Sequence, residues 1–364
     1  MKLLRYTAAL LIGLAATSLR VAAPTEASHV SCGDVLTSHT VLDSDLNCAG
    51  NGLIMGADGI SLDLNGHTIT SAGGLVGVQA WGRSGVTIRN GTVTGFLFGV
   101  WLDGTRNSSI RGVAANGNKQ TGILVTNDSD GNQVTGCTAN GNGAAGIIVH
   151  AGSDRNSVKG CTASGNGIGT AGLGIEVSLG STGNDVKENQ VVANKRNGLV
   201  LLNGANRNEV KNNTVAGNGR IGLVVQLNSL TNNIKDNVIT GNKRNGIVVQ
   251  DNSDGNVIRN NVINHNGTSG ALDGNQGIVV TLGAGHTDIR DNTINGNLRN
   301  GISVNADSSG NNTVISNSLS GNGDGVTGFN LSDLTTGPGT AGTNDTYKNN
   351  SCLTSNPLGL CSAP

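Results

Sequence analysis

Residues 198–221 read GLVLLNGANRNEVKNNTVAGNGRI, and residues 222–245 read GLVVQLNSLTNNIKDNVITGNKRN, so one pattern returns after 24 residues. Each copy opens with a glycine and a short apolar run, and asparagines and β-branched residues fill the remainder. Repetition at a fixed period of this length is typical of solenoids, in which each repeat stacks on the next. This pair decides the fold class if the pattern extends along the chain.

The glycine-led phrase does recur along most of the chain. Its copies begin at Gly52, Gly77, Gly99, Gly122, Gly146, Gly174, Gly198, Gly222, Gly246, Gly277 and Gly301, with a weaker copy at Gly325. Successive copies are separated by 25, 22, 23, 24, 28, 24, 24, 24, 31, 24 and 24 residues. One such repeat cannot bury its apolar face alone, whereas stacked repeats bury a continuous core. We therefore predict a solenoid of eleven or twelve coils.

Within each repeat, residue types keep fixed distances from the glycine. Apolar residues stand twelve and seventeen positions after it, and asparagines stand mainly ten, fifteen and twenty positions after it. β-Branched residues favour strands, and Asn and Gly tolerate the left-handed backbone of tight corners. Helical repeats would need Ala, Leu, Glu and Lys instead. The sequence predicts an all-β, right-handed, single-stranded parallel β-helix with three short strands per coil and capped ends.

The composition agrees with a narrow, repetitive core. The 364 residues include 58 glycines and 50 asparagines, but four prolines and seven aromatic residues. So little proline excludes collagen, which needs it at high frequency. The formal net charge of −1 argues against a nucleic-acid partner, because nucleic-acid-binding domains are usually strongly basic.

The first residues have the features of an export signal. Two basic residues, Lys2 and Arg5, precede an apolar run, and small residues follow near Ala23. This pattern predicts a signal peptide over residues 1–27, and its apolar run is too short to span a bilayer. We therefore expect a secreted, extracellular protein without a membrane span.

The rest of the chain divides according to its repeats. Residues 51–327 carry the repeat and form the predicted β-helix, whereas residues 28–50 and 328–364 fall outside it. A stack of parallel strands leaves an open edge at each end, and terminal caps must cover such edges. We predict that residues 28–50 form an N-terminal cap and residues 328–364 a C-terminal cap.

Six cysteines agree with an oxidising destination. They form three candidate pairs: Cys32 with Cys48, Cys352 with Cys361, and Cys137 with Cys161. The first two pairs would pin the two caps, whereas the third pair occupies one position in adjacent coils. That spacing suits either a disulfide or two stacked buried thiols, and both remain open here. No two cysteines have the Cys-x-x-Cys spacing of a zinc site, so we predict no structural metal.

The early coils also carry a family resemblance. The phrase ISLDLNGHTI (residues 60–69), just after Cys32 and Cys48, resembles the opening coils of secreted right-handed β-helix-repeat proteins. The repeats that follow are similar to the NosD-like group, and the resemblance covers residues 32–325. It implies a fold shared with pectate lyases, polygalacturonases, alginate epimerases and adhesins, and it leaves the activity open.

Two columns of basic residues appear when the coils are stacked. Thirteen positions after the glycine stand Lys159, Lys187, Lys211, Lys235, Arg259 and Arg290, which we call the lysine column. Two positions before the glycine stand Arg196, Arg220, Arg244 and Arg299, the arginine column, with Lys195 and Lys243 beside it. Acidic Glu188, Asp236 and Asp291 adjoin the lysine column and balance part of its charge. Like charges at coil spacing repel, and a polyanion along the axis would relieve this; a solvated, edge-protecting face is the alternative interpretation.

Two coils are longer than the others, and both insertions fall at the corner before the glycine. They are Gly167–Ala171 and Gly267–Asn275, and both interrupt the arginine column. Long loops on a repeat scaffold often mark the binding face. We therefore predict a groove between them, floored by Arg196, Arg220 and Arg244, that binds an acidic polysaccharide or another extracellular polyanion, with Arg299, Lys195 and Lys243 as further binding residues.

The outward positions of the glycine-led strand offer a competing site. They include Trp81, Trp101, Asp103, His150 and Glu176, with Phe96 and Phe98 near the tryptophans. Aromatic rings stack on sugars, so Trp81 and Trp101 join the predicted substrate-binding residues. Asp103, His150 and Glu176 are weak candidates for acid–base catalysis. Asp103 and His150 lie two coils apart, too far for a direct hydrogen bond.

An apolar stripe is expected on the same face. Its members are Leu124, Ile148, Val200, Val224, Val248 and Val279. An exposed apolar patch suggests a cover, either the C-terminal segment or a second subunit. We therefore keep a homo-oligomer through this stripe as an expectation.

Other chemistries lack the residues that they need. No cluster of close carboxylates of the polygalacturonase kind is present, and turns such as Asp128–Asn132 resemble calcium loops only weakly. Copper delivery needs clustered Met, Cys or His side chains. Met55 is the one methionine left after removal of the signal peptide, so the sequence does not favour this role. We predict no cofactor, with calcium only weakly supported.

Two functions remain. The first is a secreted protein that binds, and by a lyase-type step processes, an acidic polysaccharide. The second is a non-catalytic extracellular structural or interaction protein, such as an adhesin or a surface-associated solenoid. The arginine column between paired loops favours the first, and the missing carboxylate cluster favours the second.

Overall fold

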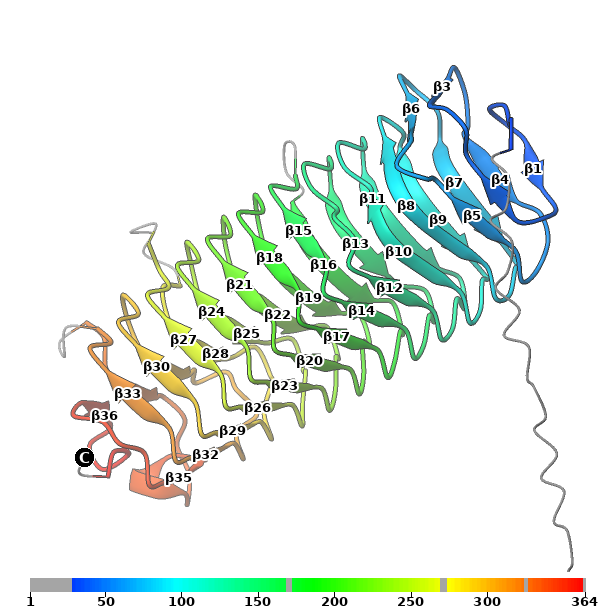
Figure 1. The fold of residues 1–364 in the computed structure, drawn as a ribbon. Helices are drawn as coiled ribbons and strands as arrows, with labels where there is room; N and C mark the ends of the chain where they lie inside the picture. The colour runs from blue at the N-terminus through cyan, green and yellow to red at the C-terminus, as the bar shows by residue number, and fades with distance from the viewer. Residues whose placement is uncertain (1–27, 168–171, 269–273, 324–326, 363–364) are drawn as a thin grey trace, which may run out of the picture.

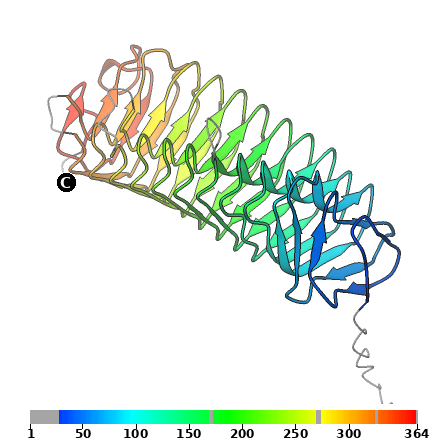
Figure 2. The same cartoon turned by 90° about the horizontal axis from the view of Figure 1, so that it is seen from above.

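The computed structural model describes residues 28–167, 172–268, 274–323 and 327–362. The predicted signal peptide, residues 1–27, and the weak repeat at Gly325 lie outside these residues. The described chain winds as an all-β solenoid with one short 3-10 turn, η1 (Thr340–Gly342). Figure 1 shows the coils following one another from the N-terminal to the C-terminal end, and Figure 2 shows the elongated stack from above. The predicted right-handed parallel β-helix is confirmed.

Three parallel sheets run along the length of the solenoid. The first sheet consists of β1 (Val35–Leu36), β4 (Leu53–Met55), β7 (Val76–Trp81), β9 (Phe98–Asp103), β11 (Thr121–Thr126), β13 (Ala145–Val149), β16 (Leu173–Ser178), β19 (Leu199–Leu202), β22 (Leu223–Gln226), β25 (Ile247–Val249), β28 (Ile278–Val280), β31 (Ile302–Val304), β34 (Leu331–Asp333) and β36 (Ser355–Asn356). Eleven of these fourteen strands, β4 to β31, correspond to the glycine-led copies.

The other two sheets form remaining sides of the coils, and the third sheet extends only from Thr162 to Ser320. The second consists of β2 (Thr40–Val41), β5 (Ser61–Asp63), β8 (Thr87–Thr94), β10 (Ser109–Ala114), β12 (Gln133–Thr135), β14 (Ser157–Lys159), β17 (Asp185–Lys187), β20 (Glu209–Lys211), β23 (Asn233–Lys235), β26 (Val257–Arg259), β29 (Asp288–Arg290), β32 (Thr313–Ile315) and β35 (Thr346–Lys348), joined through β8 by β6 (Thr68–Ser71) and β3 (Leu46–Cys48). The third consists of β15 (Thr162–Ser164), β18 (Gln190–Val192), β21 (Thr214–Ala216), β24 (Val238–Thr240), β27 (Val262–Asn264), β30 (Thr293–Asn295) and β33 (Ser318–Ser320).

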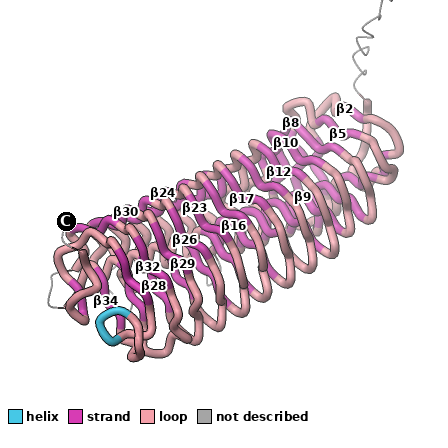
Figure 3. Tube along the Cα trace, turned by 90° about the horizontal axis from the view of Figure 1, so that it is seen from below, coloured by secondary structure: helices cyan, strands magenta, loops and turns pink. Residues whose placement is uncertain are grey.

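The sheets keep the sequence repeat in register. In the first sheet Val200 lies opposite Val224, and in the second Val210 lies opposite Ile234. Residues at one position of the repeat therefore form a column parallel to the axis, which is visible as aligned bands of strands (Figure 3). The apolar positions twelve and seventeen residues after the glycine, such as Val210 and Val215, are fully buried in the core.

The opening position of the repeat requires glycine, because there is no room for a side chain. A Cβ atom on Gly222 would lie 2.6 Å from Cγ2 of Ile239 and 2.7 Å from the carbonyl oxygen of Gly246. Non-bonded carbon atoms prefer separations of about 3.5–4.0 Å, so a larger residue cannot enter without moving the coil. The same crowding is present at Gly198 and Gly246.

The repeated asparagines form buried ladders. Asn213 donates from both its backbone N–H and its Nδ2 to Oδ1 of Asn237, at 2.9 and 3.0 Å, and Asn237 bonds Asn261 in the same way. Nδ2 of Asn213 also donates to the carbonyl oxygen of Val186. The asparagines at this position thus hydrogen-bond to one another from coil to coil. Equivalent ladders run ten and twenty positions after the glycine, for example from Asn208 to Asn232 and from Asn218 to Asn242.

The ladder asparagines do not themselves adopt the left-handed backbone that the sequence suggested. That conformation belongs to the residue just before each one, such as Asn212 (φ 54°), Asp236 (φ 56°) and Gly217 (φ 62°). A left-handed residue turns the chain and aims the following asparagine inward, where it bonds to its neighbours. The corner therefore needs two residues with separate roles.

The two end segments join the same sheets. β1 pairs with β4, β3 pairs with β6, and β34 pairs with β31. Two disulfides close these ends, Cys32–Cys48 and Cys352–Cys361, as expected. No helix in the described parts of the chain is long and apolar enough to cross a membrane.

Cys137 and Cys161 are free thiols, so the disulfide alternative for this pair is not realised. They occupy the first two positions of the ladder that continues with Asn189. Sγ of Cys161 accepts a hydrogen bond from the backbone N–H of Cys137 at 3.4 Å, and Oδ1 of Asn189 accepts one from that of Cys161. The thiols thus take the place of asparagines in a buried ladder.

Candidate functional site

The outward face of the first sheet carries both sites that the sequence suggested. One outward row contains Trp101, Ile148, Glu176, Val200 and Val248, and the next contains Trp81, Asp103, His150, Gln226 and Gln250. The arginine column borders these rows just before each strand begins. All candidates for binding and catalysis therefore share one long face, and the lysine column lies on the second sheet.

The arginine column is held in register by backbone hydrogen bonds. The N–H of Arg220 donates to the carbonyl oxygen of Arg196 at 2.7 Å, and the N–H of Arg244 donates to that of Arg220 at 2.7 Å. Gly172 precedes Arg196 in this column, and Asn275 precedes Arg299. The two predicted loops thus interrupt the column at these points, although residues 168–171 and 269–273 of the loops lie outside the described residues.

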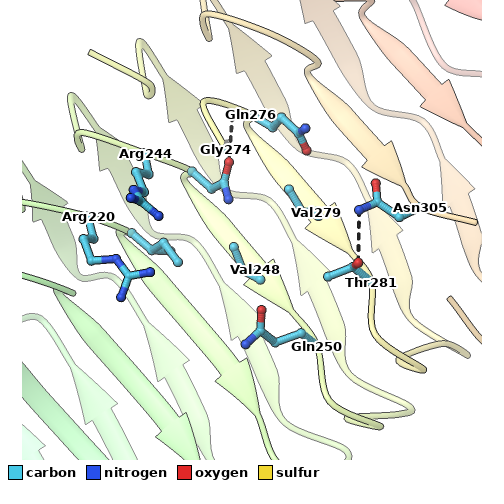
Figure 4. A pocket seen from close by; sticks show the side chains of 11 residues that line it. Arg220, Arg244, Val248, Gln250, Gly274, Gln276, Val279, Thr281 and Asn305 are labelled. Carbon is cyan, nitrogen blue, oxygen red and sulfur yellow. Dashed lines mark hydrogen bonds between the residues drawn. The ribbon is translucent and has the colours of Figure 1, made fainter. Parts of the chain in front are cut away.

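A pocket of 240 Å³ opens beside Arg220 and Arg244. Figure 4 shows the two guanidinium groups on one side, with Val248 and Gln250 on the strand beside them. The other lining residues are Ile221, Asn245, Gly274, Gln276, Val279, Thr281 and Asn305. We call this pocket the arginine groove. Its lining is rich in amide and hydroxyl groups over two nearly buried valines, which suits a ligand with many hydroxyl groups.

Among the described residues, no acidic group neutralises the charge in the arginine groove. No carboxylate of the described residues lies within 4.0 Å of the guanidinium nitrogens of Arg220 or Arg244. Nε of Arg220 is buried and has no hydrogen-bond partner in the described structure. Burial, followed by the charges of Arg244 and Arg196, lowers the pKa of Arg220 below its ordinary value. An anion between these side chains would be stabilised by groups already in place.

The lysine column is different, because five of its six bases lie close to a carboxylate, and the sixth, Arg259, donates to Oδ1 of Asn233. Lys187 bonds Asp185, Lys211 bonds Glu209, Lys235 lies 3.4 Å from Glu209, Lys159 lies 3.4 Å from Glu188, and Arg290 lies 3.1 Å from Asp288. Of the acids that the sequence suggested as partners, only Glu188 takes this role. All three of these acids occupy left-handed corner positions, and among the described residues Asp236 and Asp291 make no ion pair. In the pairs Asp185–Lys187, Glu209–Lys211 and Asp288–Arg290 the acid precedes its base by two residues, on the same side of a strand, a signal that was present in the sequence.

A second pocket, of 190 Å³, lies at the other end of the arginine run. It is lined by Ala144, Ala145, Ile148, Gly172, Leu173, Glu176 and Arg196. Glu176 is largely buried there, and its Oε1 accepts a hydrogen bond from Oγ of Ser178 at 2.6 Å. Burial raises the pKa of Glu176 above its ordinary value. The structure thus brings one catalytic candidate and one binding candidate, Glu176 and Arg196, to the same pocket, the glutamate pocket.

His150 lies close to this pocket, whereas Asp103 does not. Val149 pairs with Val177, so His150 stands opposite Ser178, the residue that bonds Glu176. Burial lowers the pKa of His150 below its ordinary value. Asp103 lies two strands further toward the N-terminus and accepts a hydrogen bond from Nδ2 of Asn127 at 2.9 Å. The three catalytic candidates therefore separate into a pair and a distant residue.

The aromatic residues form a patch at the N-terminal end of the same face. Trp81 is 69% exposed, and the ring centroids of Phe98 and Trp101 are 5.1 Å apart. Nε1 of Trp101 is buried without a hydrogen-bond partner among the described residues. Phe96, which the sequence grouped with them, is fully buried in the core because its side chain points inward.

The expected apolar stripe is not an exposed surface. Leu124, Val200, Val224, Val248 and Val279 are 1–5% exposed, and Ile148 is only half-buried. Each side chain is covered by its neighbours in the column and, at Val248 and Val279, by the walls of the arginine groove. This burial leaves almost no apolar area for the subunit contact that the sequence suggested.

The aspartates of the corner turns have structural partners. Oδ1 of Asp130 accepts the backbone N–H of Asp154, and Oδ1 of Asp154 accepts that of Thr182. Oδ1 of Asp254 accepts the backbone N–H of Gly285. In the described residues no group of three or more His, Cys, Asp or Glu side chains could hold a metal ion.

Comparison with known proteins identifies the architecture. A family model described as a right-handed beta helix region matches residues 37–191, 76–229 and 191–319. No curated protein sequence matches the chain significantly.

Several solved structures are similar to this chain at low sequence identity. The A-module of the mannuronan C-5 epimerase AlgE4 from Azotobacter vinelandii superposes with a TM-score of 0.62 and 17% identity, over 90% of this chain and 87% of that one. The periplasmic alginate epimerase AlgG gives 0.57 and 14%, over 86% and 78%. The Dettilon tailspike protein gives 0.58 and 17%, over 82% and 62%. At such identities the likeness shows the fold alone.

Proposed function

We propose that this chain, which belongs to the family of right-handed beta-helix regions, binds an acidic polysaccharide in the arginine groove. The observation that carries this proposal is the contrast between its two basic columns. Five of the six bases in the lysine column lie close to a carboxylate, whereas Arg220 and Arg244 have none nearby among the described residues. A solvated face that only prevents lateral stacking would not need a hollow beside its charges.

The nature of the groove floor supports a sugar rather than a simple anion. Gln250, Thr281 and Asn305 offer hydrogen bonds to hydroxyl groups, and the almost fully buried Val248 and Val279 close the floor beneath the ligand. Two similar solenoids are named as epimerases of mannuronan and alginate, which are acidic polysaccharides. This likeness of fold adds support to the proposal without assigning the sugar. The two disulfides agree with an extracellular or periplasmic location, which we include in the proposal.

Binding to acidic and neutral polymers tests this function. The purified protein should be retained on polygalacturonate or alginate and released by salt, because exposed charge contacts are screened. The double variant R220A/R244A should lose this retention, whereas K211A, which removes a paired lysine, should keep it. Equal retention of both variants, or equal binding to a neutral galactan, would overturn the proposal.

The glutamate pocket supports a second step, the processing of the bound chain. Burial moves the pKa of Glu176 up and that of His150 down, and His150 directly follows β13, the strand that pairs with the strand of Glu176 in the first sheet. Opposite shifts of this kind suit an acid and a base. In a lyase-type step His150 would take the C5 proton of a uronate, and that electron pair would form the C4–C5 double bond. The C4–O bond would break, and the leaving oxygen would take its proton from Glu176.

Absorbance from new unsaturated ends measures this step directly. The wild-type protein should produce it with polygalacturonate or alginate, and E176Q should bind the polymer while losing the absorbance. If the wild type retains the polymer but produces no absorbance, the protein binds the polysaccharide without the lyase-type step. Neither signal would favour the structural and interaction role.

A further inference from the structure

We propose that Arg220 and Arg244 contact two neighbouring carboxylates of one polymer chain, so that the preferred ligand is an unbranched polyuronate with a free carboxylate on every sugar. This inference rests on the proposed function and specifies the substrate class. It follows from how the groove is built along the axis.

The spacing of the two arginines is set by the backbone. Arg220 and Arg244 occupy the same position in adjacent coils, joined by the 2.7 Å hydrogen bond from the N–H of Arg244. Adjacent parallel strands lie about 4.8 Å apart. This spacing is similar to the length of one pyranose in an extended chain. A polymer that runs along the axis therefore meets one arginine for each sugar.

The floor of the groove repeats in the same direction. Val248 lies opposite Val279 in the next coil. In the adjoining row Nε2 of Gln250 donates to Oε1 of Gln226 at 2.9 Å, and Nδ2 of Asn305 donates to Oγ1 of Thr281 at 3.0 Å. Each coil thus presents an apolar side chain and a polar side chain, and this order continues only along the axis. A chain that crossed the groove would meet one coil and one arginine.

The electrostatics favour consecutive charges. The guanidinium groups of Arg220 and Arg244 repel each other, and Arg220 is partly buried with no acidic partner among the described residues. Two carboxylates at the spacing of neighbouring sugars would stabilise both groups at once. A polymer with charges on alternate sugars would leave one arginine unpartnered, and a buried unpartnered charge is costly.

Two oligomers that differ only in charge spacing test this inference. Calorimetric titration would compare hexagalacturonate with a hexagalacturonate methyl-esterified on alternate residues, using wild type, R220A, R244A and K211A. The wild type and K211A should bind the fully charged oligomer at least about tenfold more tightly, since a hydrogen-bonded charge is worth about that much. In R220A and in R244A the two oligomers should bind with about equal affinity, because only one of the two arginines remains.

The outcomes separate the two proposals. If the wild type binds both oligomers with equal affinity and R220A/R244A binds neither, the proposed function stands. The inference that the two arginines contact neighbouring carboxylates is then wrong. If the wild type binds neither oligomer nor long polygalacturonate and alginate, the proposed function fails and the inference fails with it. Preference for the fully charged oligomer that persists in R220A and in R244A would also overturn the inference.

Discussion

Asn213 shows how much of this fold depends on single side chains. Its Oδ1 accepts hydrogen bonds from Asn189, its Nδ2 donates to Asn237 and to a backbone carbonyl, and the residue is buried. Replacement by alanine removes one member from a continuous ladder and leaves buried groups on both sides without partners. The requirement is for the amide itself, because every polar atom of the side chain is used.

We predict that N213A lowers the free energy of unfolding by about 2–4 kcal/mol, because more than one buried polar group loses its partner. Chemical denaturation measured by circular dichroism would give this value. The control is N212A at the adjacent exposed corner, which tests the cost of the left-handed conformation without touching the ladder. Equal stabilities of N213A and wild type would show that the ladder contributes little.

The arginine groove also depends on individual residues, and the sequence predicted only part of it. The 24-residue period placed Arg196, Arg220 and Arg244 in one column, and the structure has that column. The sequence could not show that Arg220 lacks a partner while Lys211 bonds Glu209, because pairing depends on side-chain directions. It also could not show that the outward valines are covered, because their burial depends on neighbouring coils and on the groove walls.

At the scale of the strand, the opening glycine limits how closely the coils can stack. We predict that G222A destabilises the protein by at least about 2 kcal/mol, since overpacking costs typically 1–3 kcal/mol and the added Cβ meets both a side chain and a carbonyl oxygen. Thermal unfolding would show a lower Tm. G50A is the control, because Gly50 has no left-handed φ and nothing lies within 4 Å of the added Cβ, so it should cost less. A milder effect at Gly222 than at Gly50 would contradict the packing account.

The last coil contains a buried acidic cluster at the end of a ladder. Asp345 accepts hydrogen bonds from the N–H and Nδ2 of Asn312, where other coils have asparagine. Asp333 and Tyr347 lie beside it, and Oδ2 of Asp333 and the hydroxyl of Tyr347 are buried without partners among the described residues. Burial, together with the nearby Asp333, raises the pKa of Asp345 to about 6.

This pKa predicts that stability depends on pH. The folded state binds the proton of Asp345 more tightly than the unfolded state does. The protonated carboxyl therefore contributes its full share to the free energy of unfolding below about pH 4, and this contribution is lost as the pH rises through about 6. We expect the free energy of unfolding to fall by on the order of 2 kcal/mol across this window. Urea titrations at several pH values would measure the change.

Substitution of this carboxyl isolates its effect. In D345N an amide oxygen can still accept the bonds from Asn312, so the ladder should persist and the fall in stability between pH 4 and pH 7 should shrink. D236N, at an exposed corner, should keep the pH dependence of the wild type. If D345N retains the full dependence, another group is responsible.

At the scale of the whole molecule, the solenoid has two ends and a continuous body. The repeat predicted the body well, because one period fixes strand, core and corner in every coil. It did not predict that residues 28–50 and 328–364 also pair with the sheets, since β1, β34 and β36 lack the glycine-led phrase. Their pairing depends on the open edge of the adjacent coil rather than on a local pattern.

We propose that the end segments act as caps and that their disulfides hold them in place. Reduction should lower stability by about 2–4 kcal/mol per bond, because it restores conformational freedom to the unfolded chain. Hydrogen exchange should rise first in residues 28–50 and 352–361, while the central coils stay protected. Uniform loss of protection along the chain would show that the coils unfold as one unit.

Our central proposal is that one face of this solenoid binds an acidic polysaccharide along its axis. A crystal structure with hexagalacturonate bound tests that claim most directly. We predict density for the oligomer over Val248 and Val279, with neighbouring carboxylates against Arg220 and Arg244. Density along the lysine column, or across the coils at a single arginine, would contradict it.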